Sequence, residues 1–467
     1  MQGFGSSRAR ARLDNVVELL LLFGGMMPLT TLRKLTVALA AGALLVAGTS
    51  ASAFTKPPFP RIGGIDIGSP MNFDDPTYQA QIARQDVSIL GMYPGLAPGG
   101  KPLNTSLQAI KAKNPNTLLF LYAMLDCLGV AQANDAFAPL RTKVTSMKWW
   151  LYSDKSLSLH VLTPHDTRFG EINITQWAPK DSSGNNAVDY ITRFFVNTNL
   201  TPNPAADGIF MDNTAVNPPA AGDWQRNGTI LQPTDPKALS AFQAGYQRYY
   251  QLARSLAPGK FQIGNITEWA ASGAAIPAGY VNMVDGGVME GAIGKSWSVE
   301  GWAGWQVMMK QYNAIMAAVA EPKLIILNQW GDPTDYQSMR YGLGSTLLND
   351  GYYSFTNTAT SYHGVVWFDE FDAKLGQAQA IPTAAWKQGV WRRDFDNGIV
   401  LVNPKGNGNQ TVTLETSYVK LQGTQDPAIN NGQTVTTVTL KDRDGIILMR
   451  KNPVKRPAAP QKLTAGT

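Results

Sequence analysis

The stretch AADGIFMDNTAV, residues 205–216, decides the fold. Its apolar run from Gly208 to Met211 lies between two aspartates, Asp207 and Asp212. A short apolar run of this kind is typical of a strand that is buried in a parallel sheet. Asp207 precedes the strand and is expected to be a loop or capping group. Asp212 stands where the strand should end, so it is either a turn residue or a functional carboxylate.

Seven further apolar runs of similar length occur, and longer connections separate them. Helical patterns lie in some of these connections, for example at 236–259 and 301–322, where Pro or Gly ends the pattern. Eight short strands alternating with helices predict an α/β fold, a (β/α)8 TIM barrel over residues 54–385. The long segment 126–207 is expected to be an insertion on the catalytic side of the barrel. The seven runs span 62–68, 87–95, 117–125, 261–269, 284–291, 323–331 and 351–357.

The pattern changes from about Trp386. The stretch GVWRRDFDNGIVLVNP, residues 389–404, is two alternating runs around Asn397-Gly398, a strong hairpin signal. Three more alternating runs follow, at 410–415, 434–440 and 444–450. We therefore expect an antiparallel β-sandwich domain at 386–450, which serves packing or substrate presentation, and a disordered basic tail at 451–467.

The amino terminus has the pattern of a secretory signal peptide. Arg33 and Lys34 precede an apolar run that ends near Gly48, and an A-x-A cleavage pattern follows ahead of Phe54. The alternative is an anchor helix, but the run is shorter than the roughly 20 residues of a membrane span. We expect residues 1–53 to be upstream sequence plus signal, a mature start near Phe54, and a secreted or periplasmic protein.

Composition excludes several classes of function. The chain has 467 residues, 44% of them hydrophobic and only 16% charged, which is typical of a globular protein with a large core. Without residues 1–53 it has 35 basic and 32 acidic residues, a net charge of +3. No basic run supports nucleic-acid or membrane binding. One cysteine, Cys127, excludes an internal disulfide, and three histidines without a zinc-binding pattern predict no metal and no cofactor.

Carboxylates recur at the ends of the predicted strands. Asp212 ends the fourth run, Glu268 and Glu290 end the fifth and sixth, Asp332 follows the seventh and Asp66 lies in the first. The carboxyl ends of barrel strands meet at one face, where enzymes of this fold hold their catalytic groups. Carboxylates without histidines or metal ligands are the groups that glycoside hydrolysis requires: an acid for the leaving oxygen, and a nucleophile or base.

Aromatic and acidic residues near the same strand ends are candidates for substrate contact. A tryptophan face can stack on a sugar ring, although any one tryptophan can equally fill the core. The dense acidic cluster WFDEFD, residues 367–372, is either a solvated loop, a cation site or a substrate contact. The substrate-binding candidates are Asp66, Trp269, Trp297, Trp330, Asp332, Asp369 and Glu370.

Four motifs resemble one known family. DGIFMDN (207–213), VMEGA (288–292), WFDEFDAKLG (367–376) and VWRRDFDNGIVLVNP (390–404) are similar to those of a hypothetical glycosyl-hydrolase-like family. The resemblance covers roughly residues 61–450. It implies a TIM-barrel glycosidase with a carboxyl-terminal β domain, in which Asp212 is the fourth-strand carboxylate and Glu290 is its partner.

The sequence therefore predicts a glycosidase for an oligo- or polysaccharide substrate. Asp212 is the expected nucleophile or base and Glu290 the expected acid, with Glu268 as the competitor for the acid's role. The alternative is a non-catalytic carbohydrate-binding barrel. The linkage, the anomer and the oligomeric state are left open.

Overall fold

The computed structural model describes residues 54–67, 73–91, 102–130, 137–158, 160–164, 166–271, 278–295 and 297–452. The predicted upstream sequence and signal peptide (1–53), and the tail from 453 onward, lie outside the described residues. The chain divides into two compact units, Met1–Thr55 and Lys56–Thr467, and the following concerns the second. Within the described ranges, no helix is both long and apolar enough to cross a membrane.

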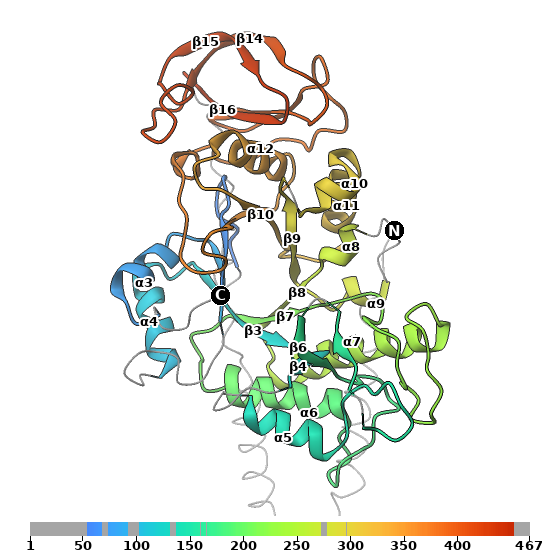
Figure 1. Ribbon diagram of the computed structural model, residues 1–467. Helices are drawn as coiled ribbons and strands as arrows, with labels where there is room; N and C mark the ends of the chain where they lie inside the picture. The colour runs from blue at the N-terminus through green and yellow to red at the C-terminus, as the bar shows by residue number, and fades with distance from the viewer. Residues whose placement is uncertain are drawn as a thin grey trace, which may run out of the picture. The chain divides into compact units, whose positions relative to one another are not determined.

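The described residues contain eight parallel strands that pair in the order β1-β2-β3-β7-β8-β9-β10-β11. A parallel bridge between Ile62 and Tyr353 joins the first strand to the last, and the Tyr353 amide donates to the Arg61 carbonyl at 2.9 Å. This pairing closes the sheet and confirms the predicted barrel (Figure 1). The strands are β1 Gly63–Asp66, β2 Val87–Leu90, β3 Leu118–Met124, β7 Gly208–Asp212, β8 Phe261–Asn265, β9 Gly286–Ile293, β10 Leu324–Gly331 and β11 Tyr352–Asn357.

Helices connect these strands along the chain. The 21-residue α7, Pro236–Leu256, shows why the sequence folds this way. Asp235 caps it by accepting from the Lys237 amide at 2.8 Å, and a proline takes the first turn, where no amide donor is needed. The other helices are α3 Pro76–Ile82, α4 Leu103–Lys113, α6 Ala187–Phe194 with η2 Phe195–Leu200, α8 Thr267–Ala271, α9 Ala278–Val281, α10 Val299–Ala303, α11 Trp305–Ala318 and α12 Tyr336–Leu347.

The insertion after β3 has its own small sheet. Strands β4 Cys127–Gly129, β5 Leu162–Thr163 and β6 Asp166–Glu171 pair antiparallel in the order β4-β6-β5, and α5 is Ala138–Ser146. Cys127 is paired with Glu171 in this sheet. Because β4 begins only three residues after β3 ends, this register carries Glu171 to the carboxyl-terminal end of the barrel.

The carboxyl-terminal strands form one five-stranded antiparallel sheet in the order β12-β13-β16-β14-β15. Val400 and Val402 belong to the core that the sheet shares with the barrel, whereas Ile399 and Leu401 belong to a second core within the sheet. Helix α12 lies between β10 and β16 in Figure 1. The strands are β12 Trp391–Asp394, β13 Gly398–Asn403, β14 Gln410–Lys420, β15 Thr434–Leu440 and β16 Asp444–Arg450.

Candidate active site

Asp212 lies at the last position of β7 and is held by three donors. The Tyr122 hydroxyl, from β3, donates to Asp212 Oδ2 at 2.5 Å, and the Asn213 amide donates to Oδ1 at 2.9 Å. Asn213 has φ of +52°, which turns the chain sharply after the strand. Asp212 therefore takes part in the turn and also presents its carboxylate at the end of the barrel.

Asn265 joins Asp212 to Glu290. Its Nδ2 atom donates to Asp212 Oδ1 at 2.9 Å and to Glu290 Oε2 at 2.8 Å, so one amide group supplies one hydrogen to each carboxyl group. The two oxygen atoms cannot be farther apart than the sum of these two distances. The pair thus falls within the span of about 10 Å that separates glycosidase carboxylates. The Tyr362 hydroxyl donates to the other oxygen of Glu290.

The protonation of Glu290 is strongly perturbed. Burial, together with the negative charge of Asp212, raises the pKa of Glu290 to about 7, although the Asn265 hydrogen bond opposes the shift. A carboxyl group with this pKa keeps its proton at mildly acidic pH. Glu290 can therefore donate a proton where an ordinary glutamate cannot.

A pocket of 540 Å³ opens beside Glu290; Asp212 is not among its lining residues, although the next residue, Asn213, is. Two exposed indoles form part of its wall: Trp297 and Trp302 keep 48% and 54% of their surface, and their rings meet edge to face at 5.1 Å. Exposed indole faces beside carboxylates are suited to stacking on sugar rings. The pocket is lined by Asp126, Thr163, Glu171, Asn213, Ala215, Asn217, Pro218, Pro219, Asn265, Thr267, Glu268, Glu290, Trp297 and Trp302.

Gly291, the residue of β9 that follows Glu290, contacts the indole of Trp297. It has φ of +56°, and a Cβ atom at this position would lie 2.0 Å from Cζ3 of Trp297. Both the backbone conformation and the lack of space therefore require glycine. The indole of Trp297 covers the residue that directly follows Glu290.

Sequence comparison now bears on this site. Residues 177–399 match the model of hypothetical glycosyl hydrolase family 15. The match confirms the family resemblance over this segment and supports a glycosidase. Asp212, Asn265, Glu268 and Glu290 all lie inside it, whereas Asp126 and Glu171 lie outside. No curated protein sequence matches the chain.

Solved glycoside hydrolases have a broadly similar arrangement of elements. The glycoside hydrolase domain of PelA from Pseudomonas aeruginosa has 11% identity and a TM-score of 0.40, with 66% of this chain and 99% of that domain covered. Alpha-amylase from Geobacillus thermoleovorans has 10% identity and a TM-score of 0.45, with 84% and 99% covered. The type III pullulan hydrolase from Thermococcus kodakarensis has 11% identity and a TM-score of 0.45, with 84% and 75% covered.

Glu268, inside the family match, lies on a helix and not on a strand. The predicted strand 261–269 ends at Asn265 because Asn265 Oδ1 accepts from the Thr267 amide at 3.1 Å, which starts α8. Glu268 lines the pocket and accepts from the Val216 amide at 2.8 Å and from the Asn217 side chain. No described contact joins Glu268 to Asp212 or to Glu290.

Three further candidates lie on or near barrel strands but do not line the pocket. Asp66, at the end of β1, is 1% exposed and accepts from Ser88 Oγ at 2.9 Å. Trp269 is also 1% exposed, and its Nε1 donates to the Thr214 carbonyl, so it fills the core. Trp330 packs edge to face on Tyr362 with ring centroids 5.0 Å apart, which places it behind a residue that contacts Glu290.

The remaining acidic candidates make structural contacts. Asp332 accepts from the Thr334 amide at 2.8 Å in the turn before α12, and this hydrogen bond lowers its pKa. Asp369 accepts from the Thr424 amide at 2.6 Å, and Glu370 accepts from Asn430 Nδ2 at 2.8 Å. Asp369 and Glu370 thus fasten the loop between β14 and β15, and the acidic cluster does not belong to the pocket lining.

Sequence analysis missed a second pair of acids in the pocket, Asp126 and Glu171. Burial together with the charge of Asp212 raises the pKa of Asp126 to about 7, and burial together with Asp126 raises the pKa of Glu171 to about 8. Asp126 follows the third apolar run, so the strand-end rule that selected Asp212 could have found it. Glu171 has no such signal, because only the pairing of β6 with β4 brings it here.

Replacing Glu171 with glutamine should stabilise the protein at high pH. The fold favours the protonated acid, whereas an unfolded glutamate loses its proton near pH 4. Stability is therefore fully present at about pH 4 and falls as pH rises toward 8. Glutamine keeps the neutral form, so Glu171→Gln should raise the free energy of unfolding at pH 8 by roughly 1–3 kcal/mol and leave it unchanged near pH 4.

Urea denaturation at the two pH values measures this difference. The matched control is Glu321→Gln, because Glu321 is 67% exposed beside Lys56 and its charge is solvated. It should show no gain at pH 8. A Glu171→Gln protein that is less stable than wild type at pH 8 would mean that the Glu171 carboxylate is charged and compensated.

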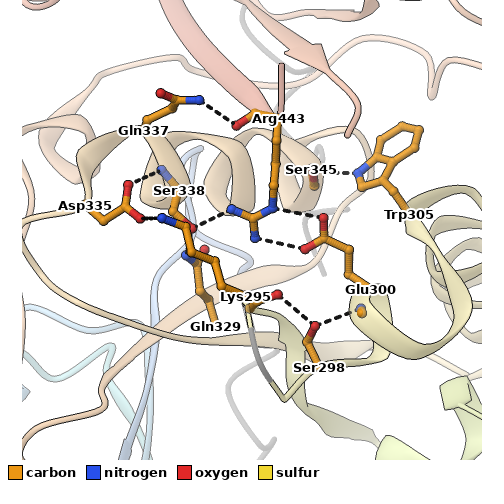
Figure 2. A network of polar contacts seen from close by, with 12 residues as sticks. Lys295, Ser298, Glu300, Trp305, Gln329, Asp335, Gln337, Ser338, Ser345 and Arg443 are labelled. Atoms are coloured by element: carbon orange, nitrogen blue, oxygen red, sulfur yellow. Dashed lines mark hydrogen bonds and ion pairs between the residues drawn. The ribbon is translucent and has the colours of Figure 1, made fainter. Parts of the chain in front are cut away.

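An ion pair from the carboxyl-terminal sheet holds the helix that carries Trp302. Arg443 binds Glu300 of α10 with two hydrogen bonds, at 3.0 and 2.9 Å, and donates to Ser338 Oγ at 2.7 Å. Figure 2 shows its guanidinium between these two partners. The Glu300 side chain is only 1% exposed, so this carboxylate depends on Arg443 for charge compensation.

Replacing Arg443 with methionine should therefore weaken substrate binding more than turnover. The unpaired Glu300 would shift α10 and with it Trp302, while Asp212 and Glu290 stay fixed on strands. We expect KM to rise at least about 3-fold with a smaller change in kcat. Steady-state kinetics would measure the split.

Adding Glu300→Leu to this variant removes the uncompensated charge and should restore KM in part. Lys295→Met is the matched control, because Lys295 is 70% exposed and its pair with Asp335 is solvated (Figure 2). A fall in kcat as large as the rise in KM, with no recovery of KM in the double variant, would contradict a positioning role for Arg443.

Proposed function

We propose that this protein hydrolyses glycosidic bonds of an extracellular oligo- or polysaccharide with the pair Asp212 and Glu290. Asp212 serves as the nucleophile, and Glu290 serves first as the acid and then as the base. The single observation that carries this proposal is the Asn265 amide, which binds both carboxyl groups with one nitrogen atom. This bridge keeps the two carboxyl groups close enough to act on one glycosidic bond.

The short separation favours retention of the anomeric configuration. Retaining enzymes hold their carboxyl groups about 5–5.5 Å apart, whereas inverting enzymes leave about 6.5–9.5 Å for a water molecule. The hydrogen bonds of 2.9 and 2.8 Å to one nitrogen limit the separation of the bonded oxygens to the shorter class.

In the first step an oxygen of Asp212 forms a bond to the anomeric carbon, and the bond to the leaving oxygen breaks as Glu290 gives that oxygen its proton. Glu290, now a carboxylate, then takes a proton from water. The resulting hydroxyl oxygen bonds to the anomeric carbon, and the ester bond to Asp212 breaks. Both carboxyl groups return to their starting states.

The surroundings of the pair support this division of roles. Glu290 has a raised pKa, as a proton donor needs, and Asp212 has three donors that stabilise a carboxylate. Trp297 and Trp302 would hold neighbouring sugar rings of a polymer. We propose that the protein acts outside the cytoplasm, in keeping with the signal-like amino terminus. We also propose that the chain divides into a barrel domain and a carboxyl-terminal β domain at residue 385.

A screen of the purified protein against a panel of polysaccharides, with product analysis, tests the proposal. We expect new reducing ends from at least one polymer, and nuclear magnetic resonance of the first products should show the anomer of the substrate. Inverted products would leave a glycosidase but overturn the nucleophilic role of Asp212. Binding to polymers without any product would favour the non-catalytic carbohydrate-binding barrel.

A further inference from the structure

The carboxyl groups around the pocket lack cationic partners. The described lining contains Asp126, Glu171, Glu268 and Glu290 but no lysine, arginine or histidine. None of these four acids, nor Asp212, forms an ion pair with a described residue. Two buried acids outside the pocket do have ion pairs: Glu300 is paired with Arg443, and Asp444 with Arg340. The pocket thus gathers carboxyl groups that have no cationic partner among the described residues.

One acid in the pocket has a free acceptor. Glu171 is 1% exposed, lines the pocket, and its Oε1 atom is buried without a hydrogen-bond partner. Asp126 beside it is 3% exposed, and its side-chain partners are neutral donors, the Asn213 amide at 3.5 Å and the Tyr246 hydroxyl. Buried polar atoms are normally paired, so an orphaned carboxyl oxygen in a pocket wall indicates that the ligand supplies its donor.

We propose that Asp126 and Glu171 form a subsite for the protonated amine of an amino sugar, so that the substrate is a polymer with free amino groups. This inference rests on the proposed glycosidase function and names the substrate class of the same site. An ammonium group brings three donors and one positive charge, which matches two adjacent acids that have no cationic partner and one open acceptor, Glu171 Oε1. An N-acetyl group removes the charge and leaves one donor.

A neutral hydroxyl group fits the same position less well. It brings one donor and no charge, so the two acids would stay buried beside each other without compensation. An amine in this position also lies in the field of the Asp212 carboxylate, which acts on Asp126 and attracts the amine. The subsite therefore favours the amine over the hydroxyl and the acetamide at the same sugar carbon.

The test compares oligosaccharides that differ only at that carbon. Tetramers of glucosamine, N-acetylglucosamine and glucose form one series, and tetramers of galactosamine, N-acetylgalactosamine and galactose form a second. Binding to the Asp212→Asn protein, which should not consume the ligand, is measured by calorimetry. We expect the amine form of at least one series to bind about 10-fold or more tightly than both of its counterparts.

Glu171→Gln in the same background should abolish this preference, whereas Glu321→Gln, the same change at an exposed site, should preserve it. The ligand series tests the proposal even where the Glu171 variant fails to fold. No preference for the amine in either series would overturn the subsite, as would a preference that persists in Glu171→Gln.

The outcomes also separate this inference from the proposed function. Hydrolysis of neutral or acetylated polymers by the wild-type protein, without amine preference, would support the glycosidase function and contradict the amine subsite. Amine-selective binding that depends on Glu171, with no product from any polymer of amino sugars, would support the subsite and contradict the glycosidase function.

Discussion

Replacing Asp212 with asparagine should lower turnover by at least about 10²-fold while the protein stays folded and still binds its substrate. Asparagine keeps the shape: its oxygen, in the place of Oδ1, can still accept from the Asn213 amide and from Asn265, and its NH2 group, in the place of Oδ2, can donate to the Tyr122 hydroxyl oxygen, so the end of β7 should be preserved. It has no negative charge and cannot form the ester with the anomeric carbon. The loss should fall on kcat, because the missing interaction is made with the transition state.

A small external nucleophile provides a sharper test. Asp212→Ala removes the carboxyl group and leaves space for azide, which can attack the anomeric carbon from the Asp212 side. Added azide should therefore restore activity to Asp212→Ala and give a glycosyl azide of inverted configuration. Near-wild-type turnover without azide would contradict the nucleophilic role of Asp212 and mean that it only shapes the turn after β7. Circular dichroism of the variant checks that the fold is intact.

The barrel was predictable because its strands carry their own signals. Each of the eight apolar runs is short, and the segments between the runs are long enough to contain a helix. The strand-end rule then located Asp212 and Glu290, since β7 ends at Asp212 and Glu290 lies in the second half of β9. Both facts follow from local sequence and the geometry of a parallel barrel.

Local sequence patterns did not predict the contacts that residues of different strands and loops make in the pocket. Asn265 escaped notice because an amide carries no charge, yet it sits at a strand end as the carboxylates do. Glu171 reaches the pocket only through pairing with Cys127, across an insertion of more than 40 residues. Tyr362 approaches Glu290 from the loop after β11, where the sequence has no periodicity to interpret.

Tertiary packing also decided the aromatic and acidic candidates. Trp269 and Trp297 look alike in the sequence, since Trp269 ends one predicted strand and Trp297 lies just beyond another. The start of α8 turns Trp269 into the core, whereas Trp297 covers Gly291 and stays exposed. Asp369 and Glu370 bind the loop between β14 and β15, more than 50 residues along the chain. No local sequence pattern predicts this contact.

Replacing Glu290 with glutamine should reduce hydrolysis of the natural polymer by at least about 10²-fold, because the leaving oxygen then receives no proton. The loss should depend on the leaving group. An aryl glycoside whose phenol departs as a stable anion needs no acid for the first step, so Glu290→Gln should form the glycosyl intermediate from it at near-wild-type rate. Asp212→Asn should lose both reactions, which distinguishes the acid from the nucleophile.

The pH profile identifies the acid independently. Burial and the charge of Asp212 raise the pKa of Glu290 to about 7, and only the protonated form can act. For the wild-type protein kcat/KM should therefore fall as pH rises through about 7, and this limb should vanish in Glu290→Gln. Glu268→Gln is the matched comparison, since Glu268 lines the same pocket without contacting the pair. If Glu268→Gln removes the limb and Glu290→Gln keeps it, the acid is Glu268 on α8, and the proton then reaches the leaving oxygen from the side wall of the pocket.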